Sequence, residues 1–232
     1  MSNQSNEISP VKLARIAGVL YLLIFICAGF AQGAVRGSIH VPGDAVATAS
    51  NIVAHEFFFR SGFVADILAF MSDAAVAVLL YVLLLPVNKT LSLLAAAFRL
   101  LAHPAIATVN LLNHYMALEF AKGADYLTVF STQQTQSLAL FFLDMHRFGY
   151  LIAGAFFGLS LLLLGYLLYK SPYFPRIIGV LIAIAAFGYF IESFGTFLFG
   201  HKELYTMIVG ITAVIGELSL TLWLLIKGVR TT

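Results

Sequence analysis

Long apolar runs separated by short polar segments make up most of this chain. Six of the runs have the length that a helix needs to cross a bilayer, about 20 apolar residues. The pattern predicts an all-α integral membrane bundle, with a polar cytoplasmic tail at 1–10 and one helical domain over 11–230. The expected spanning helices cover about 11–36, 63–85, 91–120, 148–169, 174–199 and 205–226.

Polar residues recur at regular intervals in the third run, which is otherwise apolar. At 100° per residue they fall within a stripe roughly 60° wide, so one face of this helix is polar and is expected to face the interior of the bundle. Pro104 removes the amide that would bond the carbonyl of Leu100, which predicts a kink at this depth. The stripe consists of Arg99, His103, Asn110 and His114.

Two longer polar segments carry their own helix signals: 38–60, between the first and second spans, and 121–147, between the third and fourth. Asp44 follows a turn sequence and can cap a short helix. Ser131 or Thr132, followed by glutamines, marks a second helix start, which can continue into the fourth span. We therefore expect short surface helices in both segments.

Small residues four positions apart predict close helix packing at two places. Gly29, Gly33 and Gly37 lie at the end of the first run, and Gly154 and Gly158 lie in the fourth. This spacing lets a neighbouring helix approach closely.

The composition excludes an ordinary soluble domain. The 232 residues are 61% hydrophobic and 10% charged, with a mean hydropathy of +0.95, whereas soluble domains carry about 25% charged residues. The net charge of +2 and the dispersed cations exclude a nucleic-acid partner. Cys27 lies in an apolar run and is expected to pack there.

The distribution of Lys and Arg predicts that both termini are cytoplasmic. This threading places seven cations inside and five outside, with the two longer polar segments on the outer side. The inner set is Lys12, Arg15, Lys89, Lys170, Arg176, Lys227 and Arg230, and the outer set is Arg36, Arg60, Lys122, Arg147 and Lys202.

The same threading places the polar groups within the spans in a funnel that is open outward. Arg99 and apolar residues close its inner end, and it is the one fixed cation expected among four acids. Four ionised carboxylates cannot be held there by one guanidinium, so the acids should differ in strength, with some protonated or hydrated. In an alternative reading, one or two acids pair with Arg99 as a structural clamp and the others are neutral hydrogen-bond donors. The four acids are Asp66, Asp73, Glu192 and Glu217.

Several runs resemble a bacterial membrane-protein family catalogued as a domain of unknown function, number 4386. They are ARIAGVLYLLIFI at 14–26, NIVAHEFFFRSGFVADIL at 51–68, LLYVLLLPV at 79–87 and AAFRLLAH at 96–103. The resemblance spans nearly the whole chain and implies six helices in a bacterial inner membrane. It implies no activity, and it carries over no catalytic residue.

A protein that binds or transports a small solute or cation is the first functional hypothesis. Buried acids of unequal strength are a usual means of coupling protons to movement across a membrane. Six spans are few for a transporter, which favours a homodimer. The expected binding residues are Asp66, Asp73, Arg99, His103, Asn110, His114, Glu192 and Glu217.

Two alternatives stay open at this stage. An intramembrane metal-dependent hydrolase acting on a lipid would use His103, His114 and His146 with carboxylates as zinc ligands. No H-x-x-x-H or H-E-x-x-H spacing occurs on any span, so we expect no cofactor. A scaffold or sensor would instead use the outer segments, 38–60 and 121–147, to meet a partner.

Overall fold

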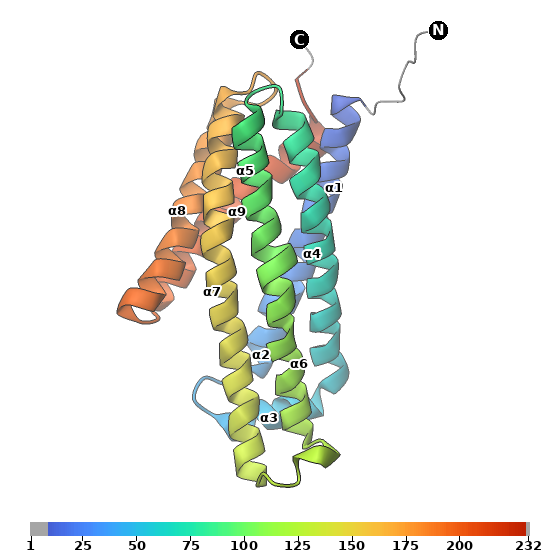
Figure 1. The fold of residues 1–232 in the computed structure, drawn as a ribbon, viewed down its shortest axis with the longest axis vertical. Helices are drawn as coiled ribbons and strands as arrows, with labels where there is room; N and C mark the ends of the chain where they lie inside the picture. The colour runs from blue at the N-terminus through green and yellow to red at the C-terminus, as the bar shows by residue number, and fades with distance from the viewer. Residues whose placement is uncertain (1–8, 231–232) are drawn as a thin grey trace.

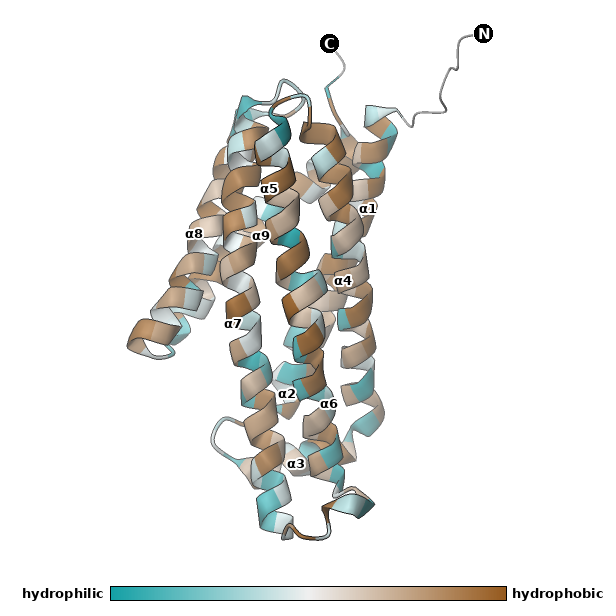
Figure 2. Cartoon of the chain, viewed as in Figure 1, coloured by the Kyte–Doolittle hydropathy of each residue, from teal (hydrophilic) through white to brown (hydrophobic). Residues whose placement is uncertain are grey.

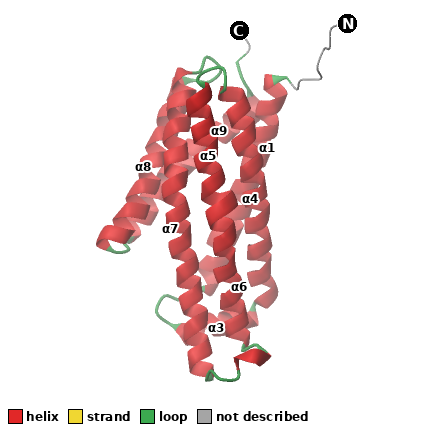
Figure 3. Ribbon diagram, viewed as in Figure 1, coloured by secondary structure: helices red, strands yellow, loops and turns green. Residues whose placement is uncertain are grey.

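The computed structural model describes residues 9–230, so most of the predicted 1–10 tail lies outside the described residues. Every regular element in the described part is a helix, as Figure 3 shows. Six helices are long and apolar enough to cross a membrane, which confirms the all-α, multi-pass prediction. They are Pro10–Ile39 (α1, the π-helix η1 and α2), Glu56–Leu84 (α4), Lys89–Lys122 (α5, the π-helix η2 and α6), Thr132–Lys170 (α7), Arg176–Phe199 (α8) and Glu203–Ile226 (α9).

The first outer segment forms the expected short helix. Asp44 accepts a hydrogen bond of 2.8 Å from the amide of Ala47 and caps α3, Ala45–Ala54. Ala49 and Ile52 are buried, because α3 packs against α6 and α7. In Figure 1, α3 crosses the bundle near the end opposite the chain termini.

The second outer segment contributes little structure of its own. A single 3₁₀ turn, η3 (Asp125–Leu127), follows α6, and α7 then begins at Thr132. Ser131 and Gln134 form a capping box, in which each side chain bonds the backbone amide of the other. The predicted surface helix is therefore the first part of α7 rather than a separate element.

The spanning helices differ greatly in length. At 1.5 Å per residue, the 39 residues of α7 extend about 58 Å and the 24 residues of α8 about 36 Å. The hydrocarbon core of a bilayer is about 30 Å thick. A bilayer matched to α8 and α9 therefore leaves the far ends of α4, α6 and α7 protruding with α3, and hydrophilic residues are frequent there in Figure 2.

The α8–α9 hairpin is anchored at the end of the bundle that holds the termini. Gly165 on α7 and Gly179 on α8 cross so closely that a Cβ on Gly165 would lie 2.8 Å from the carbonyl oxygen of Gly179. A Cβ on Gly18 of α1 would meet the backbone of Leu225 on α9 at the same distance. At its other end the hairpin diverges from the bundle, as Figure 1 shows.

The predicted glycine contacts form on α7 but not on the first helix. An added Cβ at Gly158 would lie 2.9 Å from Phe190 on α8, and one at Gly154 would lie 3.1 Å from Ser193. By contrast, a Cβ at Gly29 or Gly33 would meet nothing within 4 Å. Gly29 and Gly33 lie on an exposed face of the first helix.

The largest apolar core lies on the terminal side of the bundle. It includes Leu161 and Leu168 of α7, Ile182 of α8 and Leu224 of α9, all fully buried. This packed layer closes the bundle at the end where α8 and α9 are anchored.

Candidate functional site

Arg99 is the centre of a buried polar network near the middle of the bundle. Its side chain is 2% exposed and lies beside Asp73, which is 1% exposed. Arg99 Nε donates to Asp73 Oδ1 at 2.9 Å, and the guanidinium lies over the rings of Tyr21 and Phe157 at 4.6 and 4.9 Å. The helices α4 and α5 are therefore joined by an ion pair whose guanidinium packs against two aromatic rings.

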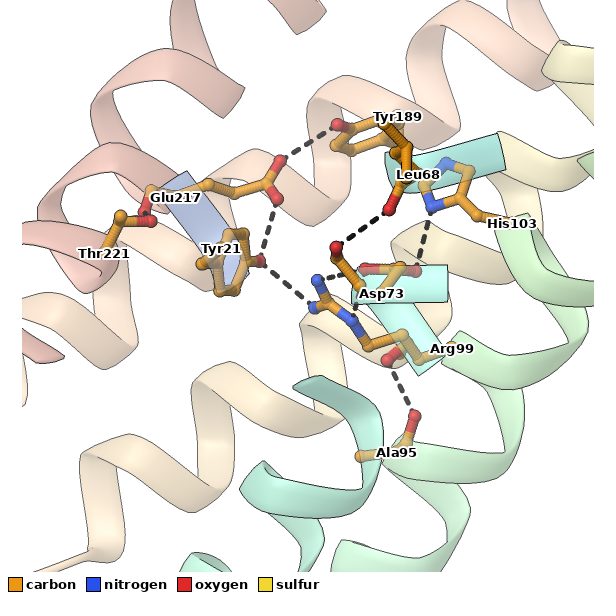
Figure 4. Close-up of polar contacts among 11 residues, drawn as sticks. Tyr21, Leu68, Asp73, Ala95, Arg99, His103, Tyr189, Glu217 and Thr221 are labelled. Atoms are coloured by element: carbon orange, nitrogen blue, oxygen red, sulfur yellow. Dashed lines mark hydrogen bonds and ion pairs between the residues drawn. The ribbon is translucent and has the colours of Figure 1, made fainter. Parts of the chain in front are cut away.

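Glu217 extends this network to the last helix. Tyr21 accepts a hydrogen bond of 3.1 Å from Arg99 and donates one of 2.9 Å to Glu217 Oε2. Tyr189 donates to Glu217 Oε1, also at 2.9 Å. Both carboxylate oxygens of Glu217 thus have phenolic partners, while Arg99 reaches this acid only through Tyr21 (Figure 4).

His103 ends the network on the other side of Asp73. Its Nδ1 lies 3.2 Å from Asp73 Oδ2, and its ring stacks on Phe70 with centroids 5.9 Å apart. We call this set the inner network. Its members are Tyr21, Asp73, Arg99, His103, Tyr189 and Glu217.

A kink is expected at Pro104. At this place the structure has a π-helix, η2, over Leu101–Ala107. A wider turn accommodates the missing amide, and such turns often occur at functional sites. The Thr108 hydroxyl donates to the carbonyl oxygen of His103 at 3.1 Å, which satisfies one of the carbonyls near the interruption.

A second buried ion pair lies farther toward the protruding end. Arg36 is 7% exposed and Asp66 is fully buried. The guanidinium donates to both oxygens of Asp66, at 2.7 and 3.2 Å, and Tyr150 donates to the same carboxylate at 3.1 Å. Gln32 accepts a hydrogen bond of 2.8 Å from Arg36 Nε. The guanidinium is therefore held by Gln32 on its own helix, η1, and by Asp66 on α4.

His114 completes this second set, which we call the outer network: Gln32, Arg36, Asp66, His114 and Tyr150. Its Nδ1 lies 3.3 Å from a guanidinium nitrogen of Arg36 and its Nε2 lies 3.1 Å from the carbonyl oxygen of Phe59. Because a guanidinium only donates, these partners assign Nδ1 as the acceptor and Nε2 as the protonated nitrogen.

Asn110 and His146 form a buried contact beside the outer network. Asn110 Nδ2 donates to the backbone oxygen of His146 at 2.7 Å, and His146 Nδ1 lies 3.2 Å from the backbone oxygen of Asn110. Gly149 permits this contact, because a Cβ there would overlap the Asn110 amide. His146 Nε2 is buried and has no hydrogen-bond partner among the described residues.

The prediction that Arg99 is the only fixed cation among the buried acids is wrong. Arg36 was expected at the outer end of the first span, but it lies on η1 inside the bundle, against Asp66. Asp66 and Asp73 therefore each have their own arginine. Glu217 has two phenols instead, and Glu192 lines a cavity.

That cavity, of about 620 Å³, lies where α8 and α9 diverge from α7 and the first helix. It contacts both networks, since Arg36 and Tyr150 line it from the outer network and His103 and Tyr189 from the inner one. A larger surface hollow of about 820 Å³ at the α7–α8 turn contacts neither. The remaining polar lining of the 620 Å³ cavity includes His40, His146, Arg147, Glu192, His201, Glu203 and Thr206.

The structure divides the residues that the sequence predicted as one funnel. Asp73, Arg99, His103 and Glu217 meet in the inner network, and Asp66 and His114 meet in the outer one. The residues that sequence reasoning missed are chiefly tyrosines and Arg36. A tyrosine in the middle of an apolar run needs a partner for its hydroxyl, and this signal was present at Tyr21, Tyr150 and Tyr189.

The histidines proposed as metal ligands do not assemble into a ligand set. His114 and His146 have ring centroids 5.6 Å apart, while His103 lies in the inner network against Asp73. No three His, Cys, Asp or Glu side chains converge on one point within residues 9–230. This geometry gives the metal-hydrolase alternative no support.

Comparison with known proteins finds similarity over most of this chain. The family model described as Domain of unknown function (DUF4386) matches residues 16–228. The chain belongs to the DUF4386 family. This DUF4386 protein is similar to an uncharacterised protein of Archaeoglobus fulgidus, with 34% identity over 160 residues, which cover 67% of this chain and 76% of the relative.

No solved structure matches this DUF4386 protein. The family description names no activity, and the similar protein is archaeal, so a bacterial setting and any substrate stay predictions.

Proposed function

We propose that this membrane protein binds a small polar solute in the cavity between α7 and the α8–α9 hairpin, as the binding step of proton-coupled transport. The observation that carries the proposal is that one cavity contacts both buried networks. A bound solute would therefore touch residues hydrogen-bonded to Asp66, to Asp73 and to Glu217. Occupancy and protonation can influence each other through these bonds.

Glu217 is the acid best suited to exchange a proton. Asp73 and Asp66 each form an ion pair with an arginine, whereas the direct partners of Glu217 are two neutral hydroxyls. Loss or gain of its proton would reorder the bonds of Tyr21 and Tyr189. Tyr189 lines the cavity, which gives Glu217 a connection to the solute through a single side chain.

The packing supports access from one side at a time. The cavity lies toward the end that carries α3 and the α8–α9 turn, and the apolar layer around Leu161 and Leu224 fills the terminal end. A transporter needs such a closed layer in each of its states. Closing the cavity would require the free end of the α8–α9 hairpin to move toward α7, and opening the terminal side would require its glycine contacts with α1 and α7 to separate.

We also propose a cytoplasmic membrane with both termini inside. With Arg36 inside the bundle, the outer cations fall from five to four against seven on the inner side. Six spans per chain favour a homodimer as the transporting unit.

Currents on a solid-supported membrane test this proposal. Purified protein in proteoliposomes would be exposed to pools of amino acids, amines and organic acids at several pH values. We expect one pool to evoke a pH-dependent current that Glu217→Gln and His103→Ala abolish. Asp125→Asn, an exposed acid on η3, is the matched control and should leave the current unchanged.

Two results would overturn the proposal. One is pH-dependent binding that survives in both variants. The other is a loss of function in cells that occurs only on substitution in 38–60 or 121–147, while substitution of the buried acids has no effect. That result would instead support a scaffold or sensor.

A further inference from the structure

The two walls of the cavity carry opposite charge. Both acids that line it, Glu192 and Glu203, come from the α8–α9 hairpin. Both arginines, Arg36 and Arg147, come from the facing side, on η1 and α7. The charges are thus sorted by helix rather than mixed.

Three of these four charges have no ionic partner within the described residues. Arg36 is paired with Asp66, but Glu192, Glu203 and Arg147 form no salt bridge. Arg147 rests instead over the ring of Phe148, with its guanidinium carbon 5.3 Å from the centroid. Opposite charges that face one cavity without pairing leave room for a molecule that pairs with both.

His146 supplies an independent sign that a ligand belongs there. Its side chain is 1% exposed, it lines the cavity beside Arg147, and its Nε2 has no partner in the described chain. A buried polar atom without a hydrogen bond costs free energy. Because His146 Nδ1 faces the backbone oxygen of Asn110, Nε2 is an acceptor, and an occupant that donates a hydrogen bond at this wall would satisfy it.

The lining also contains apolar surface, from Leu143, Leu151 and Met207. The cavity lies along the outer part of α8 and α9, where a bilayer matched to these two helices changes from hydrocarbon to headgroup. Gly33 is adjacent in sequence to Gln32, which lines the cavity, and a Cβ added to Gly33 would meet no atom within 4 Å, so this face of the first helix is open. An amphiphile can therefore present its headgroup to the cavity while its chains stay in the bilayer.

We infer that the cavity binds a zwitterion that joins an ammonium to a phosphate, with the ammonium held by Glu192 and Glu203 on one wall and the phosphate held by Arg147 on the other. This assignment rests on the proposed binding function and names its ligand class. The source favoured by the apolar lining is the headgroup of a zwitterionic phospholipid. A volume of about 620 Å³ lies in the range of ordinary ligand sites, which runs from about 300 to 1,000 Å³.

The test compares lipids that differ only in headgroup charge. Delipidated protein in detergent would be titrated with phosphatidylethanolamine, phosphatidylglycerol or a cationic lipid of matched chains, and bound lipid would be counted by native mass spectrometry. Soluble phosphoethanolamine forms a separate arm. We expect phosphatidylethanolamine to bind about tenfold more tightly than either singly charged lipid.

Variants then test the walls separately. Glu192→Gln with Glu203→Gln should reverse the preference toward phosphatidylglycerol, because only the basic wall remains. Arg147→Gln should reverse it toward the cationic lipid. A reversal cannot arise from misfolding. Asp125→Asn and Arg15→Gln, both exposed and away from the cavity, are controls that remove one negative and one positive charge elsewhere.

Each result decides the inference. Tighter binding of phosphatidylethanolamine with both reversals supports it for a lipid, and equal binding of soluble phosphoethanolamine supports it for a free zwitterion. Equal binding of all three lipids, or no binding in either arm, overturns it. Proton coupling is measured separately through Glu217, so lipid binding with no proton-coupled current would remove only the transport function.

Discussion

Tyr21 on the first spanning helix donates a 2.9 Å hydrogen bond to Glu217 on the last, and the same hydroxyl accepts from Arg99. One phenol therefore joins three helices in the middle of the bundle. The bond spans 196 positions of sequence, so it closes the bundle as well as the network.

Tyr21→Phe should destabilise the protein while preserving its packing. The substitution removes one oxygen and leaves a buried carboxylate oxygen and a guanidinium N–H without partners, at a cost of about 1–3 kcal/mol. Thermal unfolding in detergent measures the effect. Tyr126→Phe, which alters an exposed phenol on η3, is the control, and equal melting temperatures for both variants would contradict the role given to Tyr21.

Arg36 and Asp66 should be strongly coupled. Removing one partner of a buried ion pair leaves an uncompensated charge and costs about 3–5 kcal/mol, whereas removing both costs less. Arg36→Met and Asp66→Asn should each lower the melting temperature more than the double variant does. Additive losses in this double-mutant cycle would show that the two residues act independently.

Gly149→Ala should be far more damaging than Gly29→Ala, at a helical glycine with open space around it. A Cβ at Gly149 would overlap the Asn110 amide, so the contact with His146 must break or the helices must separate. We expect a loss of about 1–3 kcal/mol. Gly29→Ala, where a Cβ meets nothing within 4 Å, should be neutral or slightly stabilising. A similar loss at both glycines would exclude the overlap as the cause.

Cysteine labelling tests the threading. In a Cys27→Ala background, Asp125→Cys should react with a membrane-impermeant maleimide added to intact cells, because η3 lies at the end opposite the termini. Lys89→Cys, at the first residue of α5 near the terminal end, should react only after the cells are opened. The reverse pattern would place both termini outside.

The local pattern of hydrophobic and polar residues was sufficient to predict the helical architecture. Apolar runs identified six helices, Asp44 and Ser131 marked the starts of α3 and α7, and the stripe on the third run identified a face that is buried at Arg99, Asn110 and His114. These features depend on neighbours within a few turns of helix, so the order of residues specifies them directly.

Pairing between helices was decided only by the tertiary structure. The sequence does not specify how far each helix is rotated or where α8 and α9 diverge, and these set which acid meets which arginine. Arg36 lies 30 positions from Asp66, and its burial depends on the first helix continuing through η1. The charges that the sequence grouped in one funnel are therefore divided between two networks and a cavity, because side-chain partners in a bundle are fixed by packing across helices.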